Sequence, residues 1–152
     1  MKNTIQECGS MIASGLTVRT KNSDEFDPAT AKIGALWGEF FAKHLNENMP
    51  NMSENRLMLG VYSNYETDAS GHFDVTAAMA VDAPCKDFAN VEIPAGRYMV
   101  FECEGDMPMA VIEGWGRVWQ YFQNEAAHKR LYQTDYEAYL GPTKAAIYIG
   151  VA

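Results

Sequence analysis

Glu137 is the side chain on which a chemical interpretation of this sequence depends. It lies in the stretch Thr134-Asp-Tyr-Glu-Ala-Tyr-Leu140, where polar and apolar residues alternate and predict a strand. Tyr136 and Tyr139 flank it, and the segment just upstream carries further aromatic side chains, namely Trp115, Trp119, Tyr121 and Phe122. A carboxylate among aromatic rings needs compensation, because an unpaired buried charge is costly.

Two kinds of partner would compensate this carboxylate. One is structural: an arginine or a lysine, for example Arg97 or Arg117, forms an ion pair with Glu137. The other is a flat, apolar, cationic ligand, which the aromatic rings stack on and the carboxylate neutralises. The residue types alone leave both hypotheses open.

Motifs for other chemistries are absent from the sequence. It has no phosphate-binding glycine loop, no dinucleotide fingerprint, no G-x-S-x-G and no H-E-x-x-H. The three histidines, His44, His72 and His128, have no ligand spacing, so we expect no metal site and no cofactor.

Net charge and cysteine content indicate which binding partners and which cellular compartment to expect. The formal net charge is -8, which disfavours direct binding to nucleic acid or to an anionic membrane. Three cysteines without a C-x-x-C motif favour a reducing compartment. No apolar run approaches the roughly 20 residues of a membrane span, and the N-terminus has no signal-peptide pattern, so we expect a cytoplasmic protein.

Hydrophobic periodicity predicts two helices and six strands. Asp27 followed by Pro28 predicts the start of the first helix, as an N-cap and first helical residue. Residues 1–15, 83–90 and 124–134 have no clear pattern and are expected to be irregular. The predicted elements are strand 16–20, helix 28–46, strands 56–65 and 73–81 (a hairpin), strand 97–102, helix 109–124, and strands 135–140 and 145–151.

The same order of elements occurs twice. Each half has a strand, a helix and two strands, and the helices carry similar runs, Leu36-Trp-Gly-Glu-Phe-Phe41 and Trp115-Gly-Arg-Val-Trp-Gln-Tyr-Phe122. We therefore predict an α+β fold in one domain, 1–152, with an antiparallel sheet and two helices on one side. Two β-α-β-β modules, about 16–82 and 92–152, are expected to meet across a pseudo-two-fold axis with a central ligand cleft.

Several motifs together resemble the GyrI-like effector-binding domain. They are Leu59-Gly-Val-Tyr62, Asn64-Tyr-Glu66, Gly71-His-Phe-Asp74, Ile93-Pro-Ala-Gly-Arg-Tyr98, Trp119-Gln-Tyr121 and Thr134-Asp-Tyr-Glu-Ala-Tyr139, within a likeness that spans residues 16–152. This family supplies the ligand-sensing domain of multidrug-responsive AraC-type and MerR-type transcription regulators. In character the chain is most similar to stand-alone members encoded by integron cassettes, which bind cationic drugs.

The resemblance implies that Glu137 is the acidic group facing a cleft between the modules. We therefore expect binding of hydrophobic cationic small molecules, for sensing or sequestration, with a regulatory protein as a possible partner because the chain has no room for a DNA-binding domain. The expected ligand-binding residues are Glu137, Trp115, Trp119, Tyr98, Tyr139, Trp37, Phe41, Tyr62 and Phe73.

Two other functions stay open at this point. One is a hydrolase of small molecules, with Glu137 as general base and Tyr98 or Tyr139 as acid or orienting group. The other is a protein-interaction module, such as a gyrase modulator, which the family resemblance suggests.

Overall fold

A single antiparallel sheet organises the computed structural model, which describes residues 3–68, 70–123 and 128–152. Within these residues the sheet has eight strands in the order β1-β6-β8-β7-β3-β4-β2-β5. The strands are β1 Asn3–Cys8, β2 Met11–Lys21, β3 Met58–Ser63, β4 His72–Val81, β5 Ala89–Ile93, β6 Gly96–Glu104, β7 Arg130–Gly141 and β8 Lys144–Val151. The main helices are α2 Ile33–Ala42 and α4 Met109–Gln123, and the short ones are α1 Asn22–Glu25 and α3 Leu45–Asn48.

The strand order confirms the predicted repeat. In one half β2 leads through α2 to the hairpin β3–β4, and in the other β6 leads through α4 to β7–β8. The order β2-β4-β3 therefore mirrors β6-β8-β7, and the halves join where β3 pairs with β7. The α+β class and the antiparallel sheet with two main helices are as predicted.

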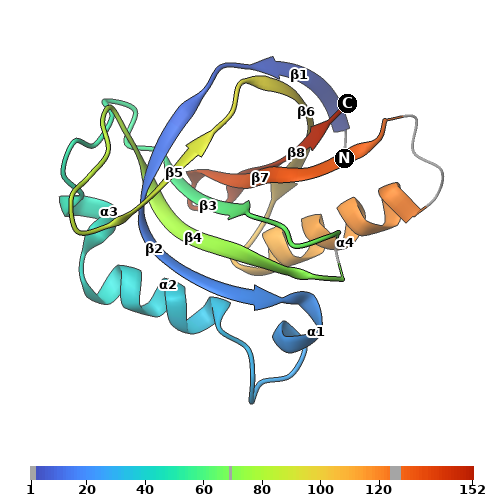
Figure 1. Ribbon diagram of the computed structural model, residues 1–152, viewed down its shortest axis with the longest axis horizontal. Coiled ribbons are helices and arrows are strands. Elements are labelled where there is room, and N and C mark those ends of the chain that lie inside the picture. Colours follow the sequence, from blue (N-terminus) through green and yellow to red (C-terminus); the bar gives the residue numbers. More distant parts are fainter. Residues whose placement is uncertain (1–2, 69, 124–127) are drawn as a thin grey trace.

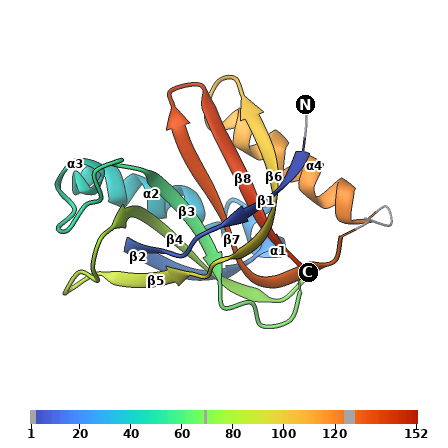
Figure 2. The ribbon, with the colours of Figure 1, turned by 90° about the horizontal axis from the view of Figure 1, so that it is seen from above.

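The two ends of the sheet belong to one continuous ribbon. β1 runs almost directly into β2, and β5 into β6, with two residues between the members of each pair. Cys8 pairs with Gly96 and Met11 with Ile93, so the register continues unshifted from β1–β6 to β2–β5. The sheet consequently curls strongly (Figures 1 and 2), which reduces the length of open strand edge.

Both main helices pack on the same face of this curled sheet (Figure 1). Leu36 and Phe40 of α2 lie in a cluster with β4 residues, and Val111 and Val118 of α4 lie in a second cluster with residues of β6 and β8. The other face has its own core around Leu59 and neighbouring apolar side chains. Each central strand therefore alternates between two buried faces. No helix in the described part of the chain has the length and apolar character of a membrane span.

The predicted start of the first helix is wrong. Asp27 closes a turn, with its carbonyl accepting from the N–H groups of Thr30 and Ala31, and α2 begins at Ile33. The Glu25 carboxylate instead caps this helix, since it accepts from the N–H of Lys32 at 2.9 Å and of Ile33 at 3.1 Å. A cap supplied from eight residues away has no local sequence signal.

The predicted helix 28–46 also extends too far, since α2 ends at Ala42. In addition, some strands of the structure were not predicted. The chain breaks at His44, whose φ of 55° is left-handed, before α3. β1, β5 and the first residues of β2 and β7 form strands in segments expected to be irregular. β1 and β5 are the two edge strands of the sheet, and β1 is largely exposed, so it needs no polar–apolar alternation. Residue 124, the predicted end of the second helix, lies outside the described residues.

We predict that Gly114 is required for α4 to lie close to the sheet. A Cβ there would come within 2.4 Å of Cys103 Sγ and 2.9 Å of Ile147 Cδ1. Gly114→Ala should lower the free energy of unfolding by about 1–3 kcal/mol, as overpacking does. Gly116→Ala is the matched control on the same helix: nothing lies within 4 Å, so it should raise stability by roughly 0.5–1 kcal/mol. Equal effects in urea unfolding would contradict this packing.

Candidate ligand-binding site

A cavity of about 810 Å³ lies over the middle of the sheet, on the face that carries the helices. Its walls come from α1, α2, β3, β4, α4 and β7, and most of them are apolar or aromatic. Its volume lies within the roughly 300–1,000 Å³ range of small-molecule sites.

The strand register places Glu137 at the centre of the sheet face that lines the cavity. Directly opposed residues share a face of the sheet, and one row of them crosses six strands. That row is Phe101, Ile147, Glu137, Gly60, Ala77 and Leu16. Glu137 and Gly60 occupy its middle, where the two halves of the fold meet, and Tyr139, two residues on, points to the same face.

The Glu137 carboxylate is almost fully buried, with 2% of the residue exposed, and three side chains donate hydrogen bonds to it. Tyr62 Oη donates to Oε1 at 2.5 Å, and Trp115 Nε1 donates to the same oxygen at 3.4 Å. Tyr139 Oη donates to Oε2. These donors come from β3, α4 and β7, so the carboxylate ties both halves of the fold together.

No cationic side chain among the described residues forms an ion pair with Glu137. The hypothesis that Arg97 or Arg117 pairs with it is wrong. Arg97 lies beside Glu7 at 3.3 Å, and Arg117 Nη2 donates to the carbonyl of Glu102 at 2.6 Å. The buried carboxylate has neutral donors and no countercharge.

Burial raises the pKa of Glu137 above its ordinary value, and the hydrogen bonds from Tyr139, Tyr62 and Trp115 offset only part of that rise. Burial, with Glu137 nearby, also raises the pKa of Tyr62 and Tyr139, so both phenols stay protonated and donate. The native state therefore holds a proton on Glu137 more tightly than the unfolded chain does. The resulting stabilisation is present below the unfolded pKa and is lost as pH rises through the folded one.

A second buried carboxylate on β7, that of Asp135, differs from Glu137 because it forms an ion pair. Asp135 lies on the same face as Glu137, is fully buried, and accepts from Arg130 Nη2 at 2.9 Å and Tyr65 Oη at 2.6 Å. Arg130 also stacks over Tyr132, 4.4 Å from the ring centroid. This arginine lines the cavity, but its charge is compensated by Asp135.

Eight of the nine predicted ligand-binding residues line the cavity: Glu137, Trp115, Trp119, Tyr139, Trp37, Phe41, Tyr62 and Phe73. Tyr62 lies edge-on to Trp115, with ring centroids 4.8 Å apart, and Trp37 lies edge-on to Tyr139 at 5.6 Å. The predicted aromatic residues from both helices therefore meet around one carboxylate.

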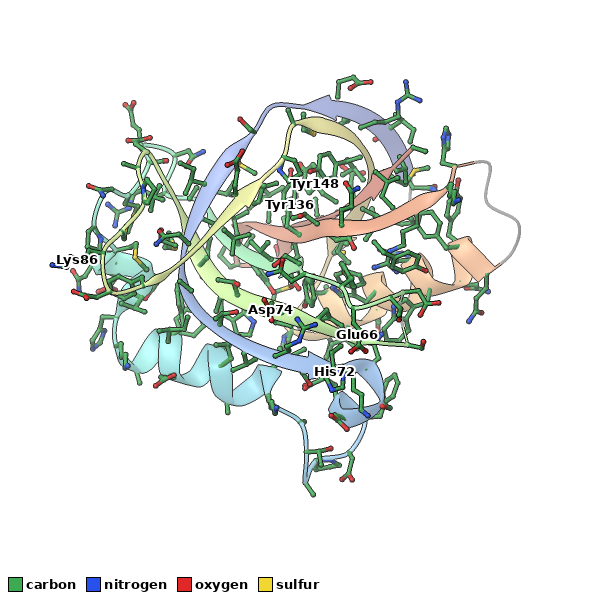
Figure 3. The ribbon with its side chains drawn as sticks, in the orientation of Figure 1. Glu66, His72, Asp74, Lys86, Tyr136 and Tyr148 are labelled. Carbon is green, nitrogen blue, oxygen red and sulfur yellow. The ribbon has the colours of Figure 1, made fainter. Side chains whose placement is uncertain are left out.

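Tyr98 is the exception and lies on the opposite face of the sheet. It pairs with Gly150, which shares a face with Tyr148, whereas Glu137 pairs with Ile147. Tyr98 packs against Tyr136 and Tyr148, which stack on each other (Figure 3) with ring centroids 4.5 Å apart. The Tyr98 hydroxyl donates to the Pro94 carbonyl. Tyr98 contacts neither the cavity nor Glu137. Its position therefore does not fit the predicted role in ligand binding, or the role of acid or orienting group in a hydrolase.

Other lining residues had no clear sequence signal. Phe26 follows α1, between the predicted strand 16–20 and the predicted helix 28–46, and its ring lies edge-on to Trp119 of α4 with ring centroids 5.9 Å apart. Met58 lines the cavity from β3, opposite Tyr139, and Arg130 lies in a stretch expected to be irregular. Only Arg130 could have been inferred, because a buried Asp135 requires a cation nearby.

Comparison with known families identifies the family of this chain. Residues 4–151 match the model of the Cass2 family, described as integron-associated effector binding protein. The chain belongs to the Cass2 family. It is thus an effector-binding protein of the GyrI-like fold, as the motifs predicted.

Three known proteins are similar to this Cass2 protein over nearly its whole length. The integron cassette protein VCH_CASS2, from the mobile metagenome of Vibrio cholerae, is 35% identical, with a TM-score of 0.86 over 99% of this chain and 95% of that one. SAV2435, solved with tetraphenylphosphonium bound, shares the fold at 20% identity and TM-score 0.81 over 100% and 94% of the two chains. A putative transcriptional regulator protein of Bacillus subtilis, YobU, is 26% identical over 147 residues, which cover 91% of this chain and 89% of that protein.

We predict that Gly60 is needed to seat the Glu137 carboxylate. A Cβ at Gly60 would lie 2.9 Å from Glu137 Cγ and 3.2 Å from its Oε1. Gly60→Ala should therefore displace the carboxylate from Tyr62 and lower the free energy of unfolding by about 1–3 kcal/mol.

Two variants control for this interpretation. Gly96→Ala adds the same methyl to a strand where nothing lies within 4 Å, and it should leave thermal stability unchanged or raise it slightly. In a Glu137→Ala background the added methyl has no carboxylate to meet, so Gly60→Ala should lose most of its cost. Undiminished destabilisation in that background would show that the contact with Glu137 is not the cause.

Proposed function

We propose that this protein binds hydrophobic organic cations in the cavity, with Glu137 as the countercharge and the aromatic side chains as stacking walls. The observation that carries the proposal is a buried carboxylate with three neutral donors and no cationic partner among the described residues. A lipophilic cation supplies the missing charge and also fills an apolar volume.

The energetics of such binding are favourable. A cation over desolvated aromatic rings gains up to about 2 kcal/mol for a well-placed contact. It also favours the ionised form of Glu137, whose pKa burial has raised. A few such contacts plus burial of the ligand's apolar surface are consistent with micromolar affinity, about -8 kcal/mol.

The relatives support the same ligand class. SAV2435 has been solved with tetraphenylphosphonium, a hydrophobic cation, on this fold. The sequence relative in Bacillus subtilis is described as a putative transcriptional regulator. We infer that the present chain acts by sequestering a cation or by reporting its presence to a regulatory partner.

The proposed functional unit is the whole chain as one effector-binding domain. The modules, about 16–82 and 92–152, would each contribute one helix and one hairpin to the walls. We place the activity in the cytoplasm, because Cys8, Cys85 and Cys103 are all free thiols, as a reducing compartment requires.

The test is Glu137→Gln, which keeps the side-chain shape and removes the charge. Affinity for tetraphenylphosphonium, followed by quenching of Trp37, Trp115 and Trp119 fluorescence, should fall roughly tenfold or more, as expected for loss of a charged contact. Affinity for neutral triphenylphosphine oxide should change far less. Glu113→Gln is the matched control, since it removes one negative charge from the exposed side of α4, away from the cavity.

Each outcome has a definite meaning. Equal loss of affinity for the cation and the neutral ligand would reject the countercharge role. A fall in cation affinity with Glu113→Gln as large as with Glu137→Gln would assign the effect to net charge. Chemical conversion of a bound ligand that disappears in Glu137→Gln while binding survives would point to a hydrolase instead.

A further inference from the structure

The hydrogen-bonding capacity of the Glu137 carboxylate is almost fully used within the protein. An ionised carboxylate offers about four lone-pair sites. Tyr62 and Trp115 donate to Oε1, and Tyr139 donates to Oε2. About one site, on Oε2, is left for a ligand.

The other carboxylate that lines the cavity is also occupied. Glu25 accepts from the Thr20 hydroxyl at 2.6 Å and from the backbone N–H groups of Lys32 and Ile33 at the start of α2. Drawing it toward a ligand would uncap that helix. Glu25 is therefore a structural acceptor rather than a second site for a ligand donor.

The next polar groups of the wall are three tyrosine hydroxyls, in addition to the side-chain amide of Asn22. Tyr65 directs its hydroxyl to Asp135 and itself accepts from Arg130. The Tyr62 and Tyr139 hydroxyls point their protons at Glu137, which leaves only their neutral phenol oxygens as acceptors. The cavity thus presents one strong negative charge, Glu137, and most of the lone pairs of that carboxylate are already used.

We infer that the cavity selects cations without N–H donors, such as quaternary ammonium and phosphonium ions, over protonated amines of the same hydrocarbon framework. This inference rests on the proposed function, since it concerns which cations Glu137 accepts. It names a narrower ligand class than hydrophobic cations in general.

The two kinds of cation differ in the hydrogen bonds to water that they lose when they enter the cavity. A primary ammonium brings three N–H donors out of water, and two of them would face aromatic rings or weak phenol acceptors. A quaternary ion has no donor to satisfy, and its charge is spread over C–H groups that suit the faces of Trp37, Trp115 and their neighbours. Tyr62 and Tyr139 therefore act as specificity-determining residues, because they occupy the carboxylate that an amine would need.

The test compares two ligands in four proteins. The ligands are 2,2-diphenylethylammonium and its N,N,N-trimethyl derivative, measured by calorimetry at about pH 8, where a primary amine with a pKa near 10 is charged. The proteins are the unaltered chain, Tyr62→Phe, Tyr139→Phe and, as a matched control on the opposite face of the sheet, Tyr148→Phe. The quantity of interest is the ratio of the two dissociation constants, primary over trimethyl.

The ratio should exceed one in the unaltered protein and fall about tenfold in Tyr62→Phe and in Tyr139→Phe, because each frees a lone pair for an ammonium N–H. Tyr148→Phe should leave it unchanged. The greater apolar area of the trimethyl ligand cancels when ratios are compared between proteins, as does any change in Glu137 ionisation, which both ligands share.

The neutral hydrocarbon with carbon in place of nitrogen separates two kinds of failure. If the trimethyl cation binds no better than this hydrocarbon, the proposed function itself fails. If the cation is preferred but the ratio does not respond to Tyr62→Phe or Tyr139→Phe, or responds equally to Tyr148→Phe, charge recognition stands and the selection for donor-free cations is refuted. Preference for the primary ammonium in the unaltered protein also refutes it.

Discussion

A buried carboxylate held by three neutral donors is the interaction on which this structure depends. Tyr62, Trp115 and Tyr139 hold Glu137 in place, yet none of them neutralises its charge. Burial and hydrogen bonding oppose each other, and the raised pKa of Glu137 shows that burial dominates. In the proposed function, a bound cation would relieve the cost of ionising Glu137, whereas Asp135 on the same strand is already paired with Arg130.

The fold makes this arrangement possible through its symmetry. β3 and β7 join the two halves, and Glu137 lies opposite Gly60 at that junction. A side chain at position 60 would occupy the space of the carboxylate, so the buried carboxylate requires a residue without a Cβ there. The helices α2 and α4, one from each half, bring tryptophans to the same cavity: Trp115 donates to the carboxylate and Trp37 contacts Tyr139.

Sequence alone predicted the features that depend on periodicity. The helix stripes, the hairpin and the duplicated β-α-β-β order follow from local alternation. The position of Glu137 at the cleft was implied by the resemblance to the GyrI-like domain. Tyr98 was misplaced because the face of a residue depends on pairing across β6, β8 and β7, and register between distant strands leaves no local pattern. Glu25 and Phe26 were missed for a related reason, since capping of α2 and contact with Trp119 are set by tertiary packing.

The central claim is that cation binding and ionisation of Glu137 are one coupled event. Its most direct test is the number of protons released when tetraphenylphosphonium binds, obtained by calorimetry in buffers of different ionisation enthalpy across a pH series. Release should approach one proton between the pKa of Glu137 in the bound and the empty protein, vanish above and below that interval, and be absent in Glu137→Gln. Binding without proton release at every pH, or the same release from Glu137→Gln, would contradict the account.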